Sequence, residues 1–210
     1  MIAARYRVFL SIFVFLSLLI DAQPLRSAPA DWYAERGSVA PKSDKIVICH
    51  GYGCVRRSIF QFSPDMIAQL RDILAAGHES PEAERTAISA AVRWFETSVR
   101  GAFHYPIDDA RSPIGLAGEV GQMDCIDEAT NTTSLLLVIA HQDLLAHHRV
   151  LKPVSRGFFL DLRGPHATAV IAETGSGERF AVDSWVRAGG AEPDVMPLKQ
   201  WYQEGNFTSH

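Results

Sequence analysis

The chain has 210 residues, 47% of them hydrophobic, and a formal net charge of −4 at pH 7. After an N-terminal leader is set aside, this length suits one domain with a hydrophobic core of its own. The acidic balance, together with the lack of a basic run or of interleaved aromatic residues, argues against a nucleic-acid-binding protein.

The first 30 residues have the layout of a secretory signal peptide. Arg5 and Arg7 precede an uncharged apolar run over 8–20, and Ala28-Pro29-Ala30 resembles an A-x-A cleavage site. The apolar run is shorter than the roughly 20 residues of a membrane-spanning helix, so an uncleaved anchor is the alternative. We expect an exported protein, periplasmic or secreted, that meets a membrane only through an uncleaved N-terminal segment. Removal of residues 1–30 takes away three arginines and one aspartate and leaves a net charge of −6.

Two of the three cysteines lie close together in Cys49-His50-Gly51-Tyr52-Gly53-Cys54. Exported proteins meet an oxidising environment, and the two glycines permit a tight reversal of the chain between the cysteines. We therefore predict a Cys49–Cys54 disulfide, which leaves Cys125 unpaired. One alternative is a metal site formed by Cys49, His50 and Cys54, which lacks an evident fourth ligand. The other is a redox-active pair, although the spacing is not C-x-x-C.

Two helices are predicted between residues 63 and 101, each with the same start signal. Ser63-Pro64-Asp65 and Ser80-Pro81-Glu82 both place a capping serine before a proline and an acid. Apolar residues then recur at helical spacing, and the helices should end near Gly77 and Gly101. Their function is predicted to be structural packing.

A long loop over 102–123 should deliver the chain to a third helix, which starts at Cys125 and reaches roughly to His147. The loop contains two prolines and three glycines, and Asp108, Asp109 and Arg111 within it are interpreted as solvated charges. Three strands are predicted to follow, over 157–162, 166–172 and 179–185.

The last two predicted strands are joined by a glycine-rich turn at 173–178. A hairpin centred near residues 174 and 175 places His166 opposite Asp183, on the same side of the sheet and within side-chain contact. A slip of one residue would put the two side chains on opposite faces, so the pairing depends on this register.

Cys125, His166 and Asp183 have the order and the chemistry of a nucleophilic triad. Asp124 should cap the helix, with Asp127 as its capping-box partner, and a cysteine in the first turn should have a lowered thiol pKa. His166 would act as general base and Asp183 would orient it. The Cys125 N–H and the Gln122 side chain are the candidate oxyanion donors. The alternatives are a lone buried cysteine, a satisfied edge-strand histidine, and Asp161 as a competing acid.

This order of residues resembles the transglutaminase-like branch of the papain-like cysteine enzymes, in particular the bacterial periplasmic transglutaminase-like cysteine proteinases. Three segments carry the resemblance, which covers about residues 80–190: Asp124-Cys125-Ile126-Asp127-Glu128-Ala129, His166-Ala167-Thr168-Ala169-Val170-Ile171 and Phe180-Ala181-Val182-Asp183-Ser184-Trp185. In that family a cysteine at a helix start is followed by a histidine and an aspartate on adjacent antiparallel strands. Ala167 stands where many members place an aromatic residue, and the Cys49–Cys54 region has no recognised counterpart.

The resemblance implies an α+β fold with a papain-like core, in which a helical N-terminal part brings the catalytic cysteine to a small antiparallel sheet. Residues 31–62 would then be an extension carrying the disulfide, and 63–210 the catalytic domain. The expected function is a cysteine hydrolase acting on a peptide or isopeptide amide in a peptide or protein substrate. The alternatives are a protein-glutamine acyl transferase and a catalytically inactive binding module. No cofactor is required; some relatives use calcium, for which Asp108, Asp109 and Asp127 could supply oxygen ligands. The sequence does not indicate an oligomeric state.

Overall fold

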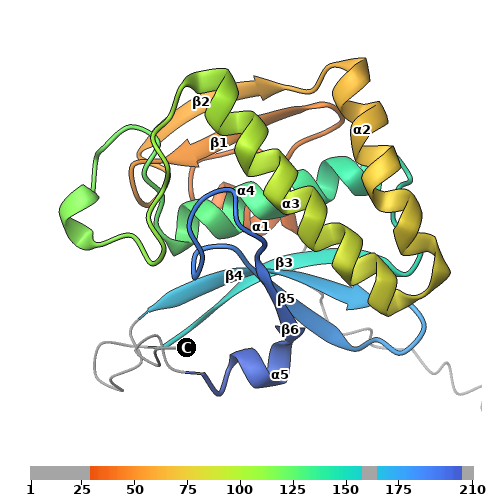
Figure 1. The fold of residues 1–210 in the computed structure, drawn as a ribbon. Helices are drawn as coiled ribbons and strands as arrows, with labels where there is room; N and C mark the ends of the chain where they lie inside the picture. Colours follow the sequence, from red (N-terminus) through yellow and green to blue (C-terminus); the bar gives the residue numbers. More distant parts are fainter. Residues whose placement is uncertain (1–28, 158–164, 205–210) are drawn as a thin grey trace, which may run out of the picture.

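The computed structural model describes residues 29–157 and 165–204, and within them the fold is a mixture of helices and two small antiparallel sheets (Figure 1). The predicted signal peptide thus lies outside the described residues, apart from its last two positions. The elements run in this order: α1 Pro29–Ala34, β1 Lys45–His50, β2 Arg56–Gln61, α2 Pro64–Ala75, α3 Pro81–Phe103, α4 Cys125–His141, β3 His148–Arg156, β4 His166–Glu173, β5 Arg179–Asp183, β6 Asp194–Pro197 and α5 Leu198–Trp201. Two 3₁₀ turns, Ala76–Glu79 and Ile114–Leu116, lie in the connections.

Helix α4 lies between the two sheets (Figure 1). The β1–β2 hairpin packs on one side of it, and the sheet with strand order β3-β4-β5-β6 packs on the other. Long helix α3 crosses the same layer and α2 packs along α3. The small C-terminal helix α5 packs on β5 and β6. Helix α4 is therefore the central element of the fold, in contact with both sheets and with α3.

The central strand β4 is buried on both faces, because the sheet is covered from two sides. Ala169 and Ile171 belong to the main core beneath the helices, whereas Val170 packs with Leu198 and Trp201 of α5. Side chains alternate between the faces of a strand, so neighbouring residues enter different cores. A strand buried in this way has an almost continuous apolar sequence, as 166–172 does.

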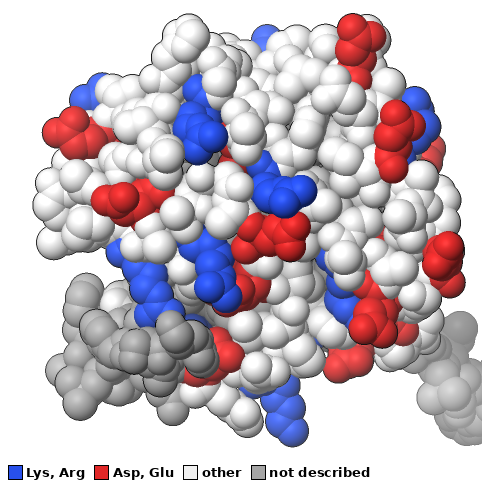
Figure 2. Space-filling view, viewed as in Figure 1, with Lys and Arg blue, Asp and Glu red and all other residues white. Residues whose placement is uncertain are grey.

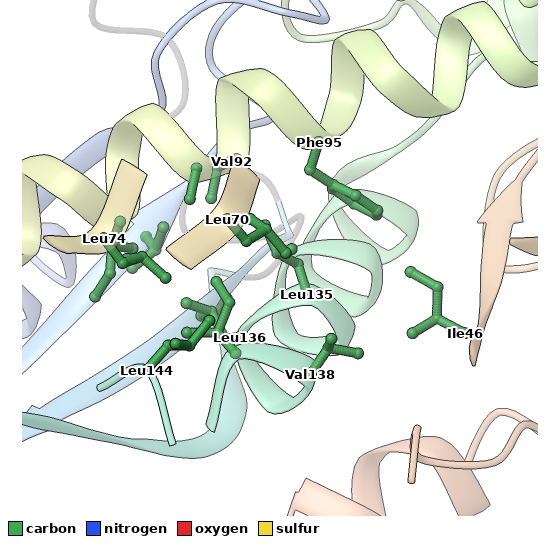
Figure 3. Close-up of a cluster of buried hydrophobic side chains, with 14 of the residues drawn as sticks. Ile46, Leu70, Leu74, Val92, Phe95, Leu135, Leu136, Val138 and Leu144 are labelled. Atoms are coloured by element: carbon green, nitrogen blue, oxygen red, sulfur yellow. The ribbon is translucent and has the colours of Figure 1, made fainter. Parts of the chain in front are cut away.

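The main core brings the β1–β2 hairpin, the three long helices and the larger sheet into one hydrophobic cluster (Figure 3). Figure 3 shows Leu135 and Leu136 of α4 beside Leu70 of α2, with Ile46 of β1 at the edge of the group. Residues of the predicted extension, such as Ile46 and Phe60, are therefore part of the same core as the predicted catalytic domain.

The predicted starts of α2 and α3 are confirmed by their caps. Ser63 and Ser80 accept hydrogen bonds from the backbone N–H groups of Met66 and Ala83, as N-cap residues do. Helix α3 continues past Gly101 to Phe103 and is ended by His104, which is in the left-handed conformation with φ of 55°.

Helix α4 ends at His141, six residues before the predicted end. The chain then turns into β3, which begins at His148 and was not expected as a strand. Pro153 interrupts its donor pattern, and its pairing with β4 shifts between Leu151 and Val154, so no regular alternation marks β3 in the sequence. The predicted strand over 157–162 falls on residues that are almost all outside the described part of the chain.

On the face seen in Figure 2, Lys and Arg side chains lie interspersed with Asp and Glu side chains. The described residues form no continuous basic surface on that face. Among the helices of residues 29–157 and 165–204, none has the length and apolar character required to cross a membrane.

Candidate active site

Cys125 is the first residue of α4, and acidic residues next to it cap the start of this helix. Asp124 is the N-cap and its Oδ1 accepts the N–H groups of Ile126 at 3.1 Å and Asp127 at 2.9 Å. The Asp127 carboxylate in turn accepts the N–H of Asp124, which completes the predicted capping box. The sequence therefore identified both the helix start and the place of Cys125 within it.

The Cys125 side chain is half-buried and packs against Ala167, the residue that follows His166 in β4. Its sulfur accepts a hydrogen bond from the Ala167 N–H. Trp32 of α1 and Ala129 of α4 belong to the same apolar cluster. The fold thus brings the thiol against β4, a strand far from α4 in the sequence. Neighbouring side chains of a strand point to opposite faces, and the ring of His166, the residue before Ala167, contacts Trp201 of α5.

The predicted lowering of the Cys125 pKa is wrong. Burial raises the pKa of this thiol to about 12, and the negative charges of Asp124 and Asp183 add to the rise. The Ala167 N–H lowers the pKa but does not offset burial. The cost of placing an anion away from water therefore outweighs the favourable N-terminal position, and the resting side chain is a thiol.

His166 and Asp183 meet as predicted, but through a different register. The hairpin pairs Ala169 with Val182 and Ala172 with Arg179, two residues away from the predicted register. A slip of two residues keeps every side chain on its predicted face. Asp183 therefore lies diagonally from His166 instead of directly opposite, and the Nε2 and Oδ2 atoms are 2.6 Å apart.

The His166–Asp183 pair is deeply buried, with side-chain exposures of 0% and 3%. The His166 Nδ1 and the Asp183 Oδ1 are also buried, and neither has a hydrogen-bond partner among the described residues. An unpartnered polar atom in a protein interior is costly unless a ligand or a reaction uses it. The free imidazole nitrogen is thus a feature that calls for a functional explanation.

Trp201 is a member of the site that the sequence did not suggest. Its indole Nε1 donates to Asp183 Oδ2 at 2.7 Å, and the side chain is completely buried. The His166 ring also contacts the rings of Trp201 and Trp185, with centroids 5.4 and 4.7 Å away. Because α5 has only four residues, no periodic pattern could have indicated this position.

The predicted disulfide between Cys49 and Cys54 is present, and its loop docks on the start of α4. The Asp127 carboxylate accepts the N–H groups of Tyr52 at 2.8 Å and Cys54 at 2.6 Å, and Asp124 accepts that of Gly53 at 3.0 Å. The four residues 51–54 all have positive φ, and in this conformation the N–H groups of Tyr52 and Cys54 face Asp127 while that of Gly53 faces Asp124.

Burial raises the pKa of Asp127 to about 7, and the charge of Asp124 adds to the rise, while the N–H groups of the loop lower it. The potential ligand atoms of Cys49, Cys54 and Asp127 all lie within 4.8 Å of one another. In the described part of the chain, no other three His, Cys, Asp or Glu residues come as close together. The disulfide uses both sulfurs, so the predicted alternative of a thiolate metal site does not fit this geometry. Asp108, Asp109 and Asp127, the suggested calcium ligands, do not form such a cluster there.

Asp108 is buried, contrary to its interpretation as a solvated charge, whereas Asp109 is exposed. The Asp108 Oδ1 accepts the Met123 N–H at 2.9 Å and the Ser112 hydroxyl at 2.8 Å, which fastens the long loop ahead of Cys125. Asp108 lines a cavity of about 30 Å³ together with Glu96 and Glu128. Burial raises the pKa of Asp108 to about 6 and that of Glu96 to about 8, and places the pKa of Glu128 well above its usual value.

Gln122, the candidate oxyanion donor, is buried beside the same loop. Its Nε2 donates to the Ile107 carbonyl at 3.1 Å, so one of its two amide hydrogens is used within the loop. Its Oε1 has no hydrogen-bond partner among the described residues. Asp161, the competing acid, lies outside the described residues.

Comparison of the chain with protein-family models, with curated proteins and with solved structures finds no match. The disulfide indicates an oxidising, exported environment.

Proposed function

We propose that the protein is an exported cysteine hydrolase of the transglutaminase-like branch of papain-like enzymes, acting on a peptide or isopeptide amide. The observation that carries the proposal is the buried His166–Asp183 pair, in which His166 Nδ1 has no partner among the described residues. The next residue, Ala167, is the one whose N–H bonds Cys125. The proposal assigns Cys125 of α4 as nucleophile, His166 of β4 as base and Asp183 of β5 as orienting acid.

The raised pKa of Cys125 implies attack by a thiol whose proton is removed during the reaction. As the sulfur bonds to the amide carbonyl carbon, His166 Nδ1 takes the thiol proton and the carbonyl oxygen becomes an oxyanion. The imidazolium then protonates the departing amine, and the C–N bond breaks to leave a thioester. Water attacks the thioester with His166 again as base, which releases the acid and restores the thiol.

The Cys125 N–H is the main oxyanion donor in this proposal. It belongs to the first turn of α4, where backbone N–H groups have no partner within the helix. The Gln122 side chain is a second donor only through the amide hydrogen that Ile107 does not use. Acyl transfer differs only in the last step, where an amine replaces water.

A catalytically inactive binding module is the second candidate, and the thiol pKa of about 12 is the observation that favours it. A thiol this difficult to ionise, without help from His166, would be an ordinary buried cysteine. The two candidates therefore differ in one measurable property, the dependence of Cys125 reactivity on His166.

The test is the rate at which a thiol-directed peptide probe labels Cys125, which is the free cysteine once Cys49 and Cys54 are oxidised. We expect His166→Ala to slow labelling by about 10²–10⁴-fold, the usual contribution of general base catalysis. His141→Ala, an exposed histidine at the other end of α4, is the matched control and should label at the wild-type rate. Equal rates for His166→Ala and wild type would leave an accessible thiol and no enzyme.

A further inference from the structure

Asp183 Oδ2 has two hydrogen-bond partners, and they differ in what they reveal about the position of the proton. His166 Nε2 lies 2.6 Å from this oxygen and Trp201 Nε1 lies 2.7 Å from it. An indole N–H can only donate, so the Trp201 bond is unambiguous in direction. The imidazole nitrogen, in contrast, can donate or accept, and which it does depends on its tautomer.

A carboxylate oxygen has two lone pairs and can accept from both nitrogens at once. If Asp183 is ionised, it has no hydrogen to give, and His166 Nε2 must carry the proton in this bond. A neutral imidazole carries one proton, which leaves Nδ1 with its lone pair. Nδ1 is the buried nitrogen that has no other partner among the described residues. In the proposed function, this is the lone pair that takes the proton of Cys125.

We propose that Trp201 is a positioning residue that selects the Nε2–H tautomer of His166 by fixing Asp183 as a double acceptor. A role of Trp201 in catalysis rests on the proposed function. Its effect on the tautomer of His166 does not depend on that function. Without the indole N–H, Asp183 retains His166 as its partner among the described residues, and its carboxyl group is free to rotate.

The indole is itself packed against residues other than Asp183. The Arg156 guanidinium lies 4.5 Å from the centroid of the Trp201 ring, and Leu198, Val170 and Ala181 pack around it as a separate hydrophobic cluster. The ring therefore cannot follow Asp183 if the carboxylate moves. A donor that is held independently of its acceptor can impose an orientation on it, which is what positioning requires.

Trp185 supplies a control for the effect of ring contact alone. Its ring centroid is closer to His166 than that of Trp201, at 4.7 Å, but its buried Nε1 has no hydrogen-bond partner among the described residues. Replacing Trp185 by phenylalanine thus changes an aromatic neighbour of His166 without removing a bond to Asp183. Trp94, whose indole donates to exposed Gln69 at 3.1 Å, supplies a control for loss of an indole hydrogen bond far from the site.

The experiment compares Trp201→Phe, Trp185→Phe and Trp94→Phe with the wild type. Long-range ¹H–¹⁵N NMR of the neutral imidazole reports which nitrogen of His166 carries the proton, and Cys125 labelling reports the consequence. We expect the wild type to show the Nε2–H tautomer, and Trp201→Phe to show a mixture with labelling slowed about tenfold. The two control variants should keep the wild-type tautomer.

Either of two results overturns the proposal. An Nδ1–H tautomer in the wild type would do so without any variant, even if Trp201→Phe fails to fold. A tautomer shift in Trp185→Phe as large as that in Trp201→Phe would assign the effect to ring packing. If the tautomer behaves as expected but His166→Ala labels Cys125 at the wild-type rate, the proposed enzyme function fails and the role of Trp201 in fixing the tautomer stands.

Discussion

The described residues include two buried histidine–carboxylate pairs of the same length, one at each end of the larger sheet. His166 Nε2 is 2.6 Å from Asp183 Oδ2, and His148 Nδ1 is 2.6 Å from Glu84 Oε2. Each histidine is the first residue of its strand, and all four side chains are at most 3% exposed. Burial and distance alone therefore do not distinguish a catalytic pair from a structural one.

The two pairs differ in how fully their atoms are satisfied. Glu84 also accepts the N–H groups of Ala146 and His147, and Arg85 lies 3.5 Å from the second ring nitrogen of His148. Burial raises the pKa of Glu84, but these hydrogen bonds together bring it below its usual value. In the other pair, His166 Nδ1 and Asp183 Oδ1 have no partner among the described residues. The pair with spare bonding capacity, and not the fully bonded one, includes the residue that precedes Ala167, against which Cys125 packs.

The largest expected effect comes from breaking the pair at the thiol. Asp183→Asn keeps the size of the side chain but no longer fixes the imidazole in one tautomer, so Cys125 labelling should slow by about 10²–10⁴-fold. Labelling kinetics under native conditions measure this. A rate within a factor of two of the wild type would show that the two pairs are equivalent.

The corresponding change at the other pair should affect stability and leave reactivity unaltered. Glu84→Ala removes the acceptor of three hydrogen bonds and leaves a buried imidazole unpaired, which should lower the free energy of unfolding by about 3–5 kcal/mol. Urea denaturation measures the loss, and Cys125 labelling of the folded fraction should not change. A reactivity loss like that of Asp183→Asn would contradict the distinction.

A smaller effect is expected from the disulfide, which supports only the end of the molecule that carries Cys125. The bridge closes a short loop, with a sequence separation of 5 between its cysteines. In the chain-entropy account, closure of such a loop stabilises the fold by about 2 kcal/mol. Cys49→Ala/Cys54→Ala should lower the free energy of unfolding by this amount, measured by denaturation without reductant. Added reductant should destabilise the wild type and not the double variant.

The smallest effect concerns pH and four buried carboxyl groups, three of which line the cavity: Glu96, Asp108 and Glu128. Asp108, Asp127, Glu96 and Glu128 have raised pKa values in the folded state, chiefly through burial. The folded protein thus keeps protons that the unfolded chain releases, so their contribution is complete below about pH 4. It is lost as pH rises from about 4 through the folded-state pKa values, which are about 6 for Asp108, 7 for Asp127 and 8 for Glu96. Thermal denaturation should show a falling Tm over this interval.

Glu128→Gln removes one of these groups and should raise Tm at pH 8 by about 3 °C, equivalent to about 1 kcal/mol in a chain of this size. Asp72→Asn, at an exposed residue of α2 that does not line the cavity, is the control and should follow the wild-type pH profile. A pH dependence of Glu128→Gln identical to that of the wild type would show that the cavity acids do not set it.

Local signals in the sequence were sufficient for the helix starts and for the site pair. Ser63, Ser80 and Asp124 each cap a helix through a hydrogen bond to a nearby N–H, an interaction that residue type and spacing specify. The face shared by His166 and Asp183 was predictable although the register was not, because strand alternation has a period of two and the error was two residues.

Features that depend on distant parts of the chain could not be predicted. The burial of Asp108 depends on Met123 and on the cavity formed with α3 and α4, which no local pattern encodes. Trp201 is in a helix of one turn, and β3 contains a proline and a register shift. The raised thiol pKa of Cys125 has the same origin, since the packing of α1 and β4 around it sets its burial.

The position of α4 between the two sheets has a consequence for local opening. Amide protons along its buried middle, such as those of Leu135 and Leu136, should exchange with solvent only when the whole domain unfolds. The first turn of a helix is where fraying usually begins, but here Asp124 and Asp127 tie it to the disulfide loop. Cys125 therefore belongs to the part of the molecule that we expect to open last, so cleavage of exposed loops by an external protease should leave Cys125 in place.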